Sequence, residues 1–358
     1  PPAPPASSSS ASTSRSLDAC RLDLDRGVLD TQRRMINPTR RAIRLAVLTC
    51  CALIAGTALP VHATLMNRWS FNNAAGSAAA GTTMTDSVGS AVATVVGNGA
   101  TFGGVSLLLP GTTNGNQTPA NISAYVDLPN GMISSKTNLS VEFWVTPISI
   151  KNWQRLFDFG RMGTLTTSVR GSGALSGEIL PNATQAPNNA TSSDDFALAF
   201  HRDGTANTQR VMARLDAATE LGSNTGAALA VGTQYHVVCT FADGIGSYGS
   251  AGGQVSWYLN GALVTTLDVS FHLSVIQDRN NWLGRSMYSA DNMANVTYNE
   301  FRLYDHVLSS AEISANLAAG PDSIVVPEPP VTVNPPTPDH LWTFTEQASS
   351  SVASGKTF

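Results

Sequence analysis

Residues 139–147 read LSVEFWVTP, and residues 153–160 shortly after them read WQRLFDFG. Apolar and polar residues alternate along the first segment, which places Val141, Phe143 and Val145 on one face of a strand. A proline cannot donate to a sheet ladder, so we expect Pro147 to end this strand. The first segment therefore predicts a strand that is buried on one side.

The same alternation recurs later in the chain. In residues 235–241, YHVVCTF, every second side chain faces the same side of a predicted strand. Residues 254–267, QVSWYLNGALVTTL, predict a hairpin, because their Asn-Gly dipeptide supplies the positive φ angles that a two-residue turn requires. The register of this turn pairs Leu259 with Ala262 and predicts pairing of Trp257 with Val264. The predicted core face of the hairpin consists of Val255, Trp257, Leu259, Ala262 and Val264.

The region before these segments also has strand patterns. Residues 65–71, LMNRWSF, predict a first strand with Trp69 and Phe71 directed inward. Residues 91–96 and 124–128 predict two further short strands with turn residues between them. Short strands at this spacing are typical of an all-β protein.

The last predicted strand is followed by a helix signal. Residues 299–304 read NEFRLY and predict the final strand. Ser309 and Glu312 then have the spacing of a capping box, in which each side chain bonds a free backbone group of the other residue. We expect a short helix that begins there and ends near Gly320.

Taken in order, these segments resemble the laminin-G-like (concanavalin A-like) jelly-roll domains, over roughly residues 65–320. The resemblance implies an all-β, antiparallel jelly-roll β-sandwich whose first and last strands are adjacent. Members of this family attach to glycans, matrix proteins or surface polymers, often with a calcium ion. Long glycine- and serine-rich segments at residues 161–195 and 240–253 depart from the pattern, so the loop geometry and any ligand site stay open.

The composition suits a turn-rich β protein. Only 13% of the 358 residues are charged, and the chain contains 30 glycines. The net charge is −4, and residues 1–63 contain eight Arg against four Asp, which leaves −8 for the rest of the chain. We expect no nucleic-acid partner, because nucleic-acid-binding domains carry a basic surface.

The N-terminal part has the pattern of an export signal. Residues 1–34 have a disordered composition and are excluded from the predicted fold. Residues 35–63 predict a signal peptide, because arginines precede an apolar run that is shorter than the roughly 18–20 residues of a spanning helix. We therefore expect a secreted or cell-surface protein with no membrane span in the mature chain.

The domain boundaries follow from these signals. Residues 64–320 are the predicted jelly-roll domain, and residues 321–338 are a proline-rich linker. Residues 339–344, DHLWTF, echo residues 67–71, NRWSF, so residues 339–358 are expected to begin a second laminin-G-like repeat.

Cysteine chemistry has little support. Three of the four cysteines precede residue 64, so the predicted mature chain keeps Cys239 alone and contains no internal disulfide. Cys239 shares a face with apolar residues of its strand, which predicts a buried, inert thiol rather than a nucleophile.

No catalytic constellation accompanies the fold signals. Glucanases on this sandwich place acidic residues at alternate positions of one strand, where they share a face. After residue 63 no two acidic residues stand two positions apart, and Asp194 and Asp195 would point to opposite faces. The chain also has no Gly-x-Ser-x-Gly or His-Glu-x-x-His motif. Carboxylates from different strands can still meet, so a glycoside hydrolase stays an alternative.

Calcium is the one candidate cofactor that the sequence offers. A hard cation prefers carboxylate, amide and backbone oxygens from loops. If the first and last strands are adjacent, four candidate ligands converge. The alternative is that the loop residues are turn formers and that the glutamate is a surface charge. The candidates are Asn72, Asn73, Asp86 and Glu300.

Four aromatic residues in or near predicted loops are candidates for stacking on sugars, because flat rings cover the apolar faces of pyranoses. The alternative for Trp153 and Trp282 is that they cap the ends of the sandwich. The candidates are Trp153, Tyr248, Trp282 and Tyr288.

The function expected from the sequence is a secreted or cell-surface, non-catalytic module for adhesion or carbohydrate binding within a larger multidomain protein. Its expected partner is a carbohydrate or a polymer of the matrix or cell surface. Two alternatives remain, a glycoside hydrolase or its accessory domain, and a structural spacer repeat.

Overall fold

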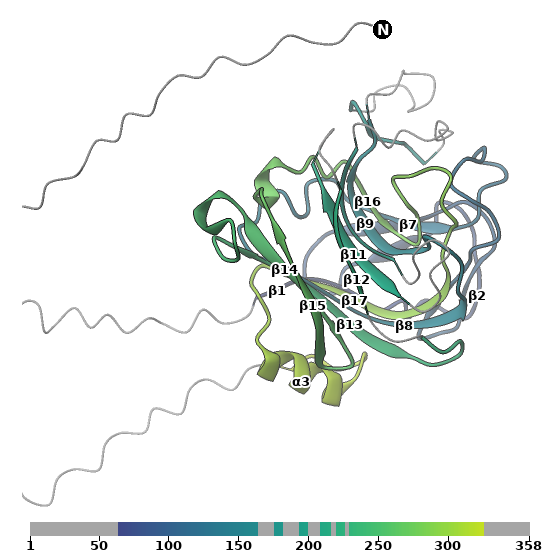
Figure 1. Ribbon diagram of the computed structural model, residues 1–358. Helices are drawn as coiled ribbons and strands as arrows, with labels where there is room; N and C mark the ends of the chain where they lie inside the picture. The colour runs from purple at the N-terminus through teal and green to yellow at the C-terminus, as the bar shows by residue number, and fades with distance from the viewer. Residues whose placement is uncertain are drawn as a thin grey trace, which may run out of the picture. The chain divides into compact units, whose positions relative to one another are not determined.

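The computed structural model describes residues 64–163, 175–181, 193–199, 208–215, 220–225 and 229–325. The predicted leader (1–63), most of the linker and residues 339–358 lie outside the described residues, so these assignments stay predictions. The described part consists of two β-sheets and helix α3, Ser310–Ala319 (Figure 1). Every strand pairing is antiparallel, which confirms the all-β, antiparallel jelly-roll sandwich.

The first sheet has nine strands in the order β15-β14-β13-β8-β17-β6-β5-β2, and β1 pairs separately with β17. This pairing confirms that the first and last strands are adjacent. The strands are β1 (Leu65–Trp69), β2 (Gly76–Ala78), β5 (Ala100–Phe102), β6 (Leu107–Pro110), β8 (Leu139–Ser149), β13 (Tyr235–Asp243), β14 (Gly253–Leu259), β15 (Ala262–Val269) and β17 (Asn295–Tyr304).

The second sheet has eight strands in the order β12-β11-β10-β9-β16-β7-β4-β3. Two short 3₁₀ turns, Gly249–Ala251 and Leu273–Val275, lie in the connections of the sandwich. The strands are β3 (Thr83–Thr85), β4 (Val92–Val96), β7 (Tyr125–Leu128), β9 (Arg155–Arg161), β10 (Asp194–Ala199), β11 (Gln209–Arg214), β12 (Leu221–Thr225) and β16 (Asn280–Leu283).

The core lies between the two sheets and is built from alternate side chains. Val141, Phe143 and Val145 of β8 are fully buried in it, as the alternation predicts. The ring of Phe143 stacks 5.9 Å from that of Phe301 on β17 and meets the edge of Phe157 on β9 at 6.1 Å. Each such ring contributes about 1.5–3 kcal/mol by leaving water, and it ties one sheet to the other.

Strand β8 does not end at Pro147, contrary to the sequence prediction. Pro147 pairs with Val296 of β17, and β8 continues to Ser149. The carbonyl oxygen of Pro147 accepts from the backbone N–H of Gly232, on the side away from β17. A strand residue points its N–H and C=O to the same side, so the missing N–H costs the β17 ladder nothing.

The predicted hairpin is confirmed in its turn and corrected in its register. Asn260 and its glycine neighbour have φ angles of 48° and 81°, and Leu259 pairs with Ala262. A bulge between Trp257 and the next residue makes Trp257 pair with Thr265. The extra residue is Val264, which packs against the core, whereas Ala262 is exposed and does not belong to the predicted core face.

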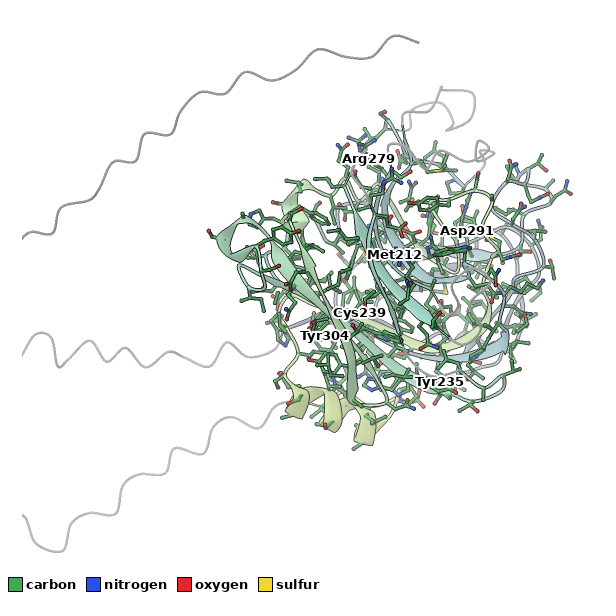
Figure 2. The ribbon with its side chains drawn as sticks, in the orientation of Figure 1. Met212, Tyr235, Cys239, Arg279, Asp291 and Tyr304 are labelled. Atoms are coloured by element: carbon green, nitrogen blue, oxygen red, sulfur yellow. The ribbon has the colours of Figure 1, made fainter. Side chains whose placement is uncertain are left out.

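The capping box of α3 is confirmed. The Ser309 hydroxyl accepts from the backbone N–H of Glu312, and the Glu312 carboxylate accepts from the backbone N–H of Ser309 at 2.8 Å. Gly320 ends the helix with a φ of 79°. Leu308 and Ile313 are buried in one cluster with Val238 and Tyr304, so the helix packs on the outer face of the nine-stranded sheet; Figure 2 labels Tyr304 close to it.

A buried polar network also attaches α3 to this face, with Glu142 of β8 at its centre. Burial alone would raise the pKa of Glu142, but its hydrogen-bond donors and positive neighbours hold that pKa below the usual range. The Glu142 carboxylate contacts Nε2 of His236 (2.9 Å), Nη1 of Arg302 (3.2 Å), the Tyr304 hydroxyl (2.7 Å) and Nδ2 of Asn316 (3.0 Å).

The chain after α3 is held by the same network. Nη2 of Arg302 donates to the carbonyl oxygens of Pro321 (2.8 Å) and Ser323 (2.6 Å), and Arg302 also pairs with Glu300. The start of the predicted linker is therefore fixed to the sandwich.

Cys239 lies in the core with no exposed surface, and burial raises the pKa of its thiol, as expected for an inert cysteine. Among the residues that the structure describes, no helix is long and apolar enough to cross a membrane.

Candidate functional site

The outer face of the eight-stranded sheet carries an unusual set of charged side chains. On β9 the rings of Phe157 and Phe159 enter the core, so Asp158 between them points outward. On β10 Phe196 enters the core in the same way, and Asp195 points outward. The alternation that builds the core thus places two carboxyl groups on the opposite face.

Two of the predicted sugar-stacking residues lie on this face and both contact Arg155. The guanidinium carbon of Arg155 lies 5.4 Å from the ring centroid of Trp153 and 5.6 Å from that of Tyr288. Both distances fall in the range of a cation–π contact. Both aromatic residues are half-buried, so part of each remains open to solvent.

Trp153 is held in place by small residues of the sheet. It packs against Ala197 and Ala199 of β10 and against Met212 of β11, which is labelled in Figure 2. Its φ angle is 61°, a conformation that residues other than glycine seldom adopt. The backbone carbonyl of Trp153 accepts a hydrogen bond of 3.0 Å from Nη1 of Arg155.

Tyr288 lies at the centre of a polar rim. Its hydroxyl donates to Oε2 of Glu220 at 3.0 Å and accepts from Nη1 of Arg214 at 2.9 Å. The other oxygen of Glu220 pairs with Arg210 at 2.6 Å. Burial raises the pKa of the Tyr288 hydroxyl, and the nearby acidic residues raise it further, so this hydroxyl stays protonated.

Arg155 joins the rim to the floor of the site. Nη2 lies 3.1 Å from Asp291 at the rim, and Nε lies 3.4 Å from Asp158 beneath. Burial alone would lower the pKa of Arg155, but the two carboxylates raise it above its ordinary value. The guanidinium is therefore a permanent positive charge between the aromatic rings and the acidic floor.

Asp158 and Asp195 form this floor and are both fully buried. Burial raises the pKa of Asp158 to about 7, although Oδ2 accepts from the backbone N–H of Met287 at 2.9 Å. Asp195 has a pKa well above its usual range, because burial and the charges of Asp158 and Glu220 all oppose its ionisation. Neither carboxyl oxygen of Asp195 has a hydrogen-bond partner among the described residues.

We call this group the outer-face site. Its charged members were not predicted as site residues from the sequence. A signal for Asp158 was present in WQRLFDFG, where this residue lies between two rings that enter the core, but a single strand does not reveal its partners on the neighbouring strands. The members of the site are Trp153, Arg155, Asp158, Asp195, Arg214, Glu220, Tyr288 and Asp291.

The other two predicted aromatic residues lie elsewhere. Trp282 is part of strand β16 rather than a loop and has no exposed surface. Its Nε1 donates to Asp127 at 3.1 Å, and its ring meets Tyr125 edge-on at 5.6 Å. Tyr248 lies in the connection between β13 and β14 and is 43% exposed. A sugar-binding role for either residue stays a prediction.

The four predicted calcium ligands divide into two groups: Asp86 and Glu300 both contact Arg68, and Asn72 and Asn73 line a pocket. Oδ1 of Asp86 accepts from the backbone N–H of Arg68 at 2.8 Å, and the side chain of Arg68 pairs with Glu300 at 2.6 Å. Glu300 is fully buried between this arginine and Arg302, so it is not a surface charge. Asn72 and Asn73 line a separate pocket, described below.

No group of three or more His, Cys, Asp and Glu residues suited to a metal ion occurs in the described ranges. Burial tends to raise the pKa of Asp86, but four hydrogen-bond donors hold that pKa below its usual value. Calcium binding stays a prediction.

Comparison with known proteins agrees with this fold. A family model described as the concanavalin A-like lectin/glucanases superfamily matches residues 119–314, and the chain belongs to this superfamily. The superfamily joins lectins and glucanases, so membership alone is compatible with carbohydrate binding and with hydrolysis. A search of curated proteins finds no match.

Solved structures show a distant likeness. Domain 4 of AbnA, a GH43 extracellular arabinanase from Geobacillus stearothermophilus in complex with arabinotriose, is 15% identical with a TM-score of 0.46, covering 72% of this chain and 99% of that one. Trypanosoma rangeli sialidase with the inhibitor DANA is 17% identical with a TM-score of 0.41, covering 78% and 38%. At these values the likeness carries no conclusion about ligand or reaction.

Proposed function

We propose that this chain is a secreted or cell-surface, non-catalytic module that binds carbohydrate at the outer-face site. The observation that carries the proposal is the pair of half-buried rings, Trp153 and Tyr288, held against Arg155 and bordered by polar groups. The signal-peptide pattern of residues 35–63 supports export.

The chemistry of the site suits a sugar chain. The carbon-bound hydrogens of a pyranose or furanose ring pack on an aromatic face, which leaves the hydroxyl groups at the edge of the ring. Glu220 and Asp291 can accept hydrogen bonds from those hydroxyls, and their carboxylates are partly exposed. Fixed aromatic rings with a few placed polar groups are the usual composition of a small-ligand site.

A glycan array with the full chain, probed with and without EDTA, tests the proposal. We expect binding to at least one neutral or acidic glycan, and Trp153→Ala should lower its affinity by at least about tenfold. Tyr288→Phe keeps the ring and serves as a milder variant in case the first one folds poorly. Tyr248→Ala is the matched control, because this exposed aromatic lies on a connection of the other sheet.

Two results would contradict the proposal. One is the absence of any glycan ligand under both conditions, which would favour the structural spacer. The other is unchanged affinity in Trp153→Ala together with a loss in Tyr248→Ala, which would move the site to the β13–β14 connection. Loss of binding in EDTA alone would support the calcium prediction.

A glycoside hydrolase is the second candidate, and the floor of the outer-face site favours it over other enzymes. Asp158 lies opposite Ala197, two positions from Asp195, so the two carboxylates are diagonal neighbours on adjacent strands. Such neighbours are typically about 7–8 Å apart or less, and paired carboxyls of glycosidases are separated by roughly 5–9.5 Å. Burial raises the pKa of both carboxyl groups, and a carboxyl group that keeps its proton near neutral pH can act as a general acid.

The burial of both carboxyl groups favours binding over hydrolysis, since a reacting sugar must touch them. Release of reducing sugar from arabinan and β-glucan decides between the two. Activity that is lost in Asp195→Asn and retained in Tyr248→Ala would establish the enzyme. Glycan binding without sugar release, unchanged in Asp195→Asn, would establish the binding module.

A further inference from the structure

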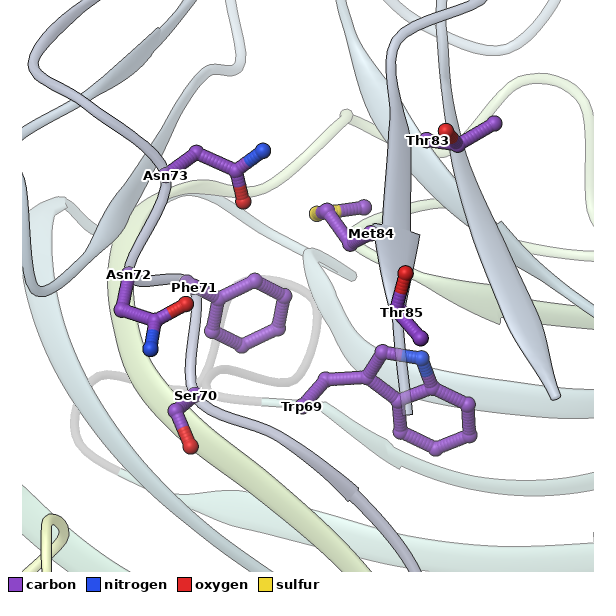
Figure 3. Close-up of a pocket in the computed structure, with 8 residues that line it drawn as sticks. All are labelled: Trp69, Ser70, Phe71, Asn72, Asn73, Thr83, Met84 and Thr85. Carbon is purple, nitrogen blue, oxygen red and sulfur yellow. The ribbon is translucent and has the colours of Figure 1, made fainter. Parts of the chain in front are cut away.

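A cavity lies away from the outer-face site, where β1 leaves the nine-stranded sheet. Its volume is about 230 Å³. Figure 3 shows Asn72 and Asn73 on one side of this cavity and strand β3, with Thr83 and Thr85, on the other. The ring of Phe71 lies between these two walls, and the ring of Trp69 lies beside Thr85. The cavity has an aromatic floor and polar walls.

The walls offer hydrogen bonds without charge. None of the eight described residues that line the cavity carries a charge. The amides of Asn72 and Asn73 each present both donors and acceptors, and the hydroxyls of Thr83 and Thr85 can act as either. Such a lining disfavours an ion and favours a neutral ligand with many hydroxyl groups.

The indole of Trp69, one of the residues that line this cavity, has an unused donor. Trp69 is 1% exposed, and its Nε1 has no hydrogen-bond partner among the described residues. Figure 3 shows the nitrogen-bearing edge of the ring turned toward the strand that carries Met84 and Thr85. A buried donor left unpaired is unfavourable, so a ligand hydroxyl that accepts from it gains affinity. By contrast, Nε1 of the buried Trp282 donates to Asp127.

The backbone beside the cavity is strained in a way that shapes it. Phe71 has a φ angle of 49°, which is uncommon for a residue with a side chain. Its ring is buried and lies 6.1 Å from that of Tyr298 on β17, so the core holds this conformation in place. The turn directs the following residues, Asn72 and Asn73, to the cavity wall.

The size of the cavity limits the ligand. It holds roughly seven or eight waters, and it is smaller than the 300–1,000 Å³ of typical drug-sized sites. We propose that this cavity, which we call the Trp69 pocket, binds a single neutral sugar ring, either a monosaccharide or the end residue of a glycan. This second site is independent of the outer-face site and does not need it.

The indole N–H of Trp69 gives a direct readout. The full chain labelled with ¹⁵N-tryptophan is titrated separately with glucose, galactose and arabinose, and the indole N–H resonances are followed. Trp69→Phe identifies the Trp69 resonance and removes the donor while keeping an aromatic ring. We expect at least one of these sugars to shift the Trp69 resonance saturably in the millimolar range, where weak single-ring sites lie.

Variants of the wall separate a bound sugar from other causes. The double variant Asn72→Ala and Asn73→Ala should weaken the titration at least about tenfold. Asn72 is exposed and Asn73 half-buried, so these changes leave the core intact. Asn121→Ala, at another exposed asparagine, is the matched control and should change nothing. Trp153→Ala should also leave the Trp69 titration unchanged, which distinguishes this site from the outer-face site.

Two outcomes would overturn the proposal. If none of the three sugars shifts the Trp69 resonance, the Trp69 pocket does not bind a sugar ring. If the shift persists unchanged in the double asparagine variant, the sugar binds elsewhere and the Trp69 pocket is not a site.

Discussion

Replacing Glu142 by leucine tests whether the buried network attaches α3 to the sandwich. Leucine has a similar volume and no acceptor, so Glu142→Leu removes the hydrogen bonds and leaves little cavity. Arg302 keeps its pairing with Glu300 and the carbonyls of the chain after α3. The Tyr304 hydroxyl and the Asn316 amide lose the carboxylate that they now contact.

The expected loss follows from the burial of these partners. Removing one member of a buried ion pair costs about 3–5 kcal/mol, because the buried donors that faced it lose an acceptor. For a domain of this size each kcal/mol lowers the melting temperature by about 2–4 °C, so we expect a decrease of roughly 6–20 °C. Folding lowers the pKa of Glu142 below its unfolded value of 4.5. The stabilisation is therefore fully present above pH 4.5, and it is lost as the pH falls through the lower pKa of the folded state.

Urea unfolding of both proteins measures the free-energy difference, and hydrogen exchange measures the opening of α3. The matched control is Glu312→Ala, at a half-buried glutamate on the helix itself, which removes its capping bonds to Ser309 and should cost about 1 kcal/mol. A loss of less than about 1 kcal/mol in Glu142→Leu, or amide protection in α3 equal to that of the wild type, would refute the reasoning.

Three further predictions concern stability and reactivity. Burial raises the pKa of Asp158 from 3.8 to about 7, so between these pH values the folded state holds a proton that the unfolded state releases. Stability therefore falls as the pH rises through this window, by up to about 4 kcal/mol. Asp158→Asn should flatten this pH dependence, which urea titrations below and above the window measure. Gly160→Ala should lower the melting temperature, because its Cβ would overlap the backbone of Asp194, at a cost of about 1–3 kcal/mol. Cys239 should not react with a thiol reagent in the folded protein and should react after unfolding in urea.

The sequence predicted those parts of the fold that depend on local patterns. Alternation located the buried face of residues 139–147, and the spacing of Ser309 and Glu312 located the start of α3. The pairing of Trp257 was wrong because a bulge depends on both strands of a hairpin and leaves no mark in a period of two. Pro147 did not end β8. A missing N–H interrupts a sheet only where that N–H would have bonded a neighbouring strand, and the sequence does not show which strand lies on that side.

The candidate sites were harder to predict, because each is assembled across strands. Asp158 and Asp195 come together only because β9 and β10 pair in the register that sets Asp158 opposite Ala197. A shift of that register by one residue would turn one of the two carboxyls into the core. Glu142 and Arg302 face each other for the same reason, since they are opposite partners in the β8–β17 pairing.

A search along one strand for two acidic residues on the same face therefore misses this kind of site. The informative local signal is different. It is a charged residue at an outward position of a strand whose inward neighbours are large and apolar, as Asp158 is between Phe157 and Phe159 and Glu142 is between Val141 and Phe143. Such a residue faces outward whichever strand lies beside it. Where a loop or helix covers that outer face, the buried charge needs an ion-pair or hydrogen-bond partner there. In this sandwich both covered outer faces contain such residues, and one of them is the site that we propose binds sugar.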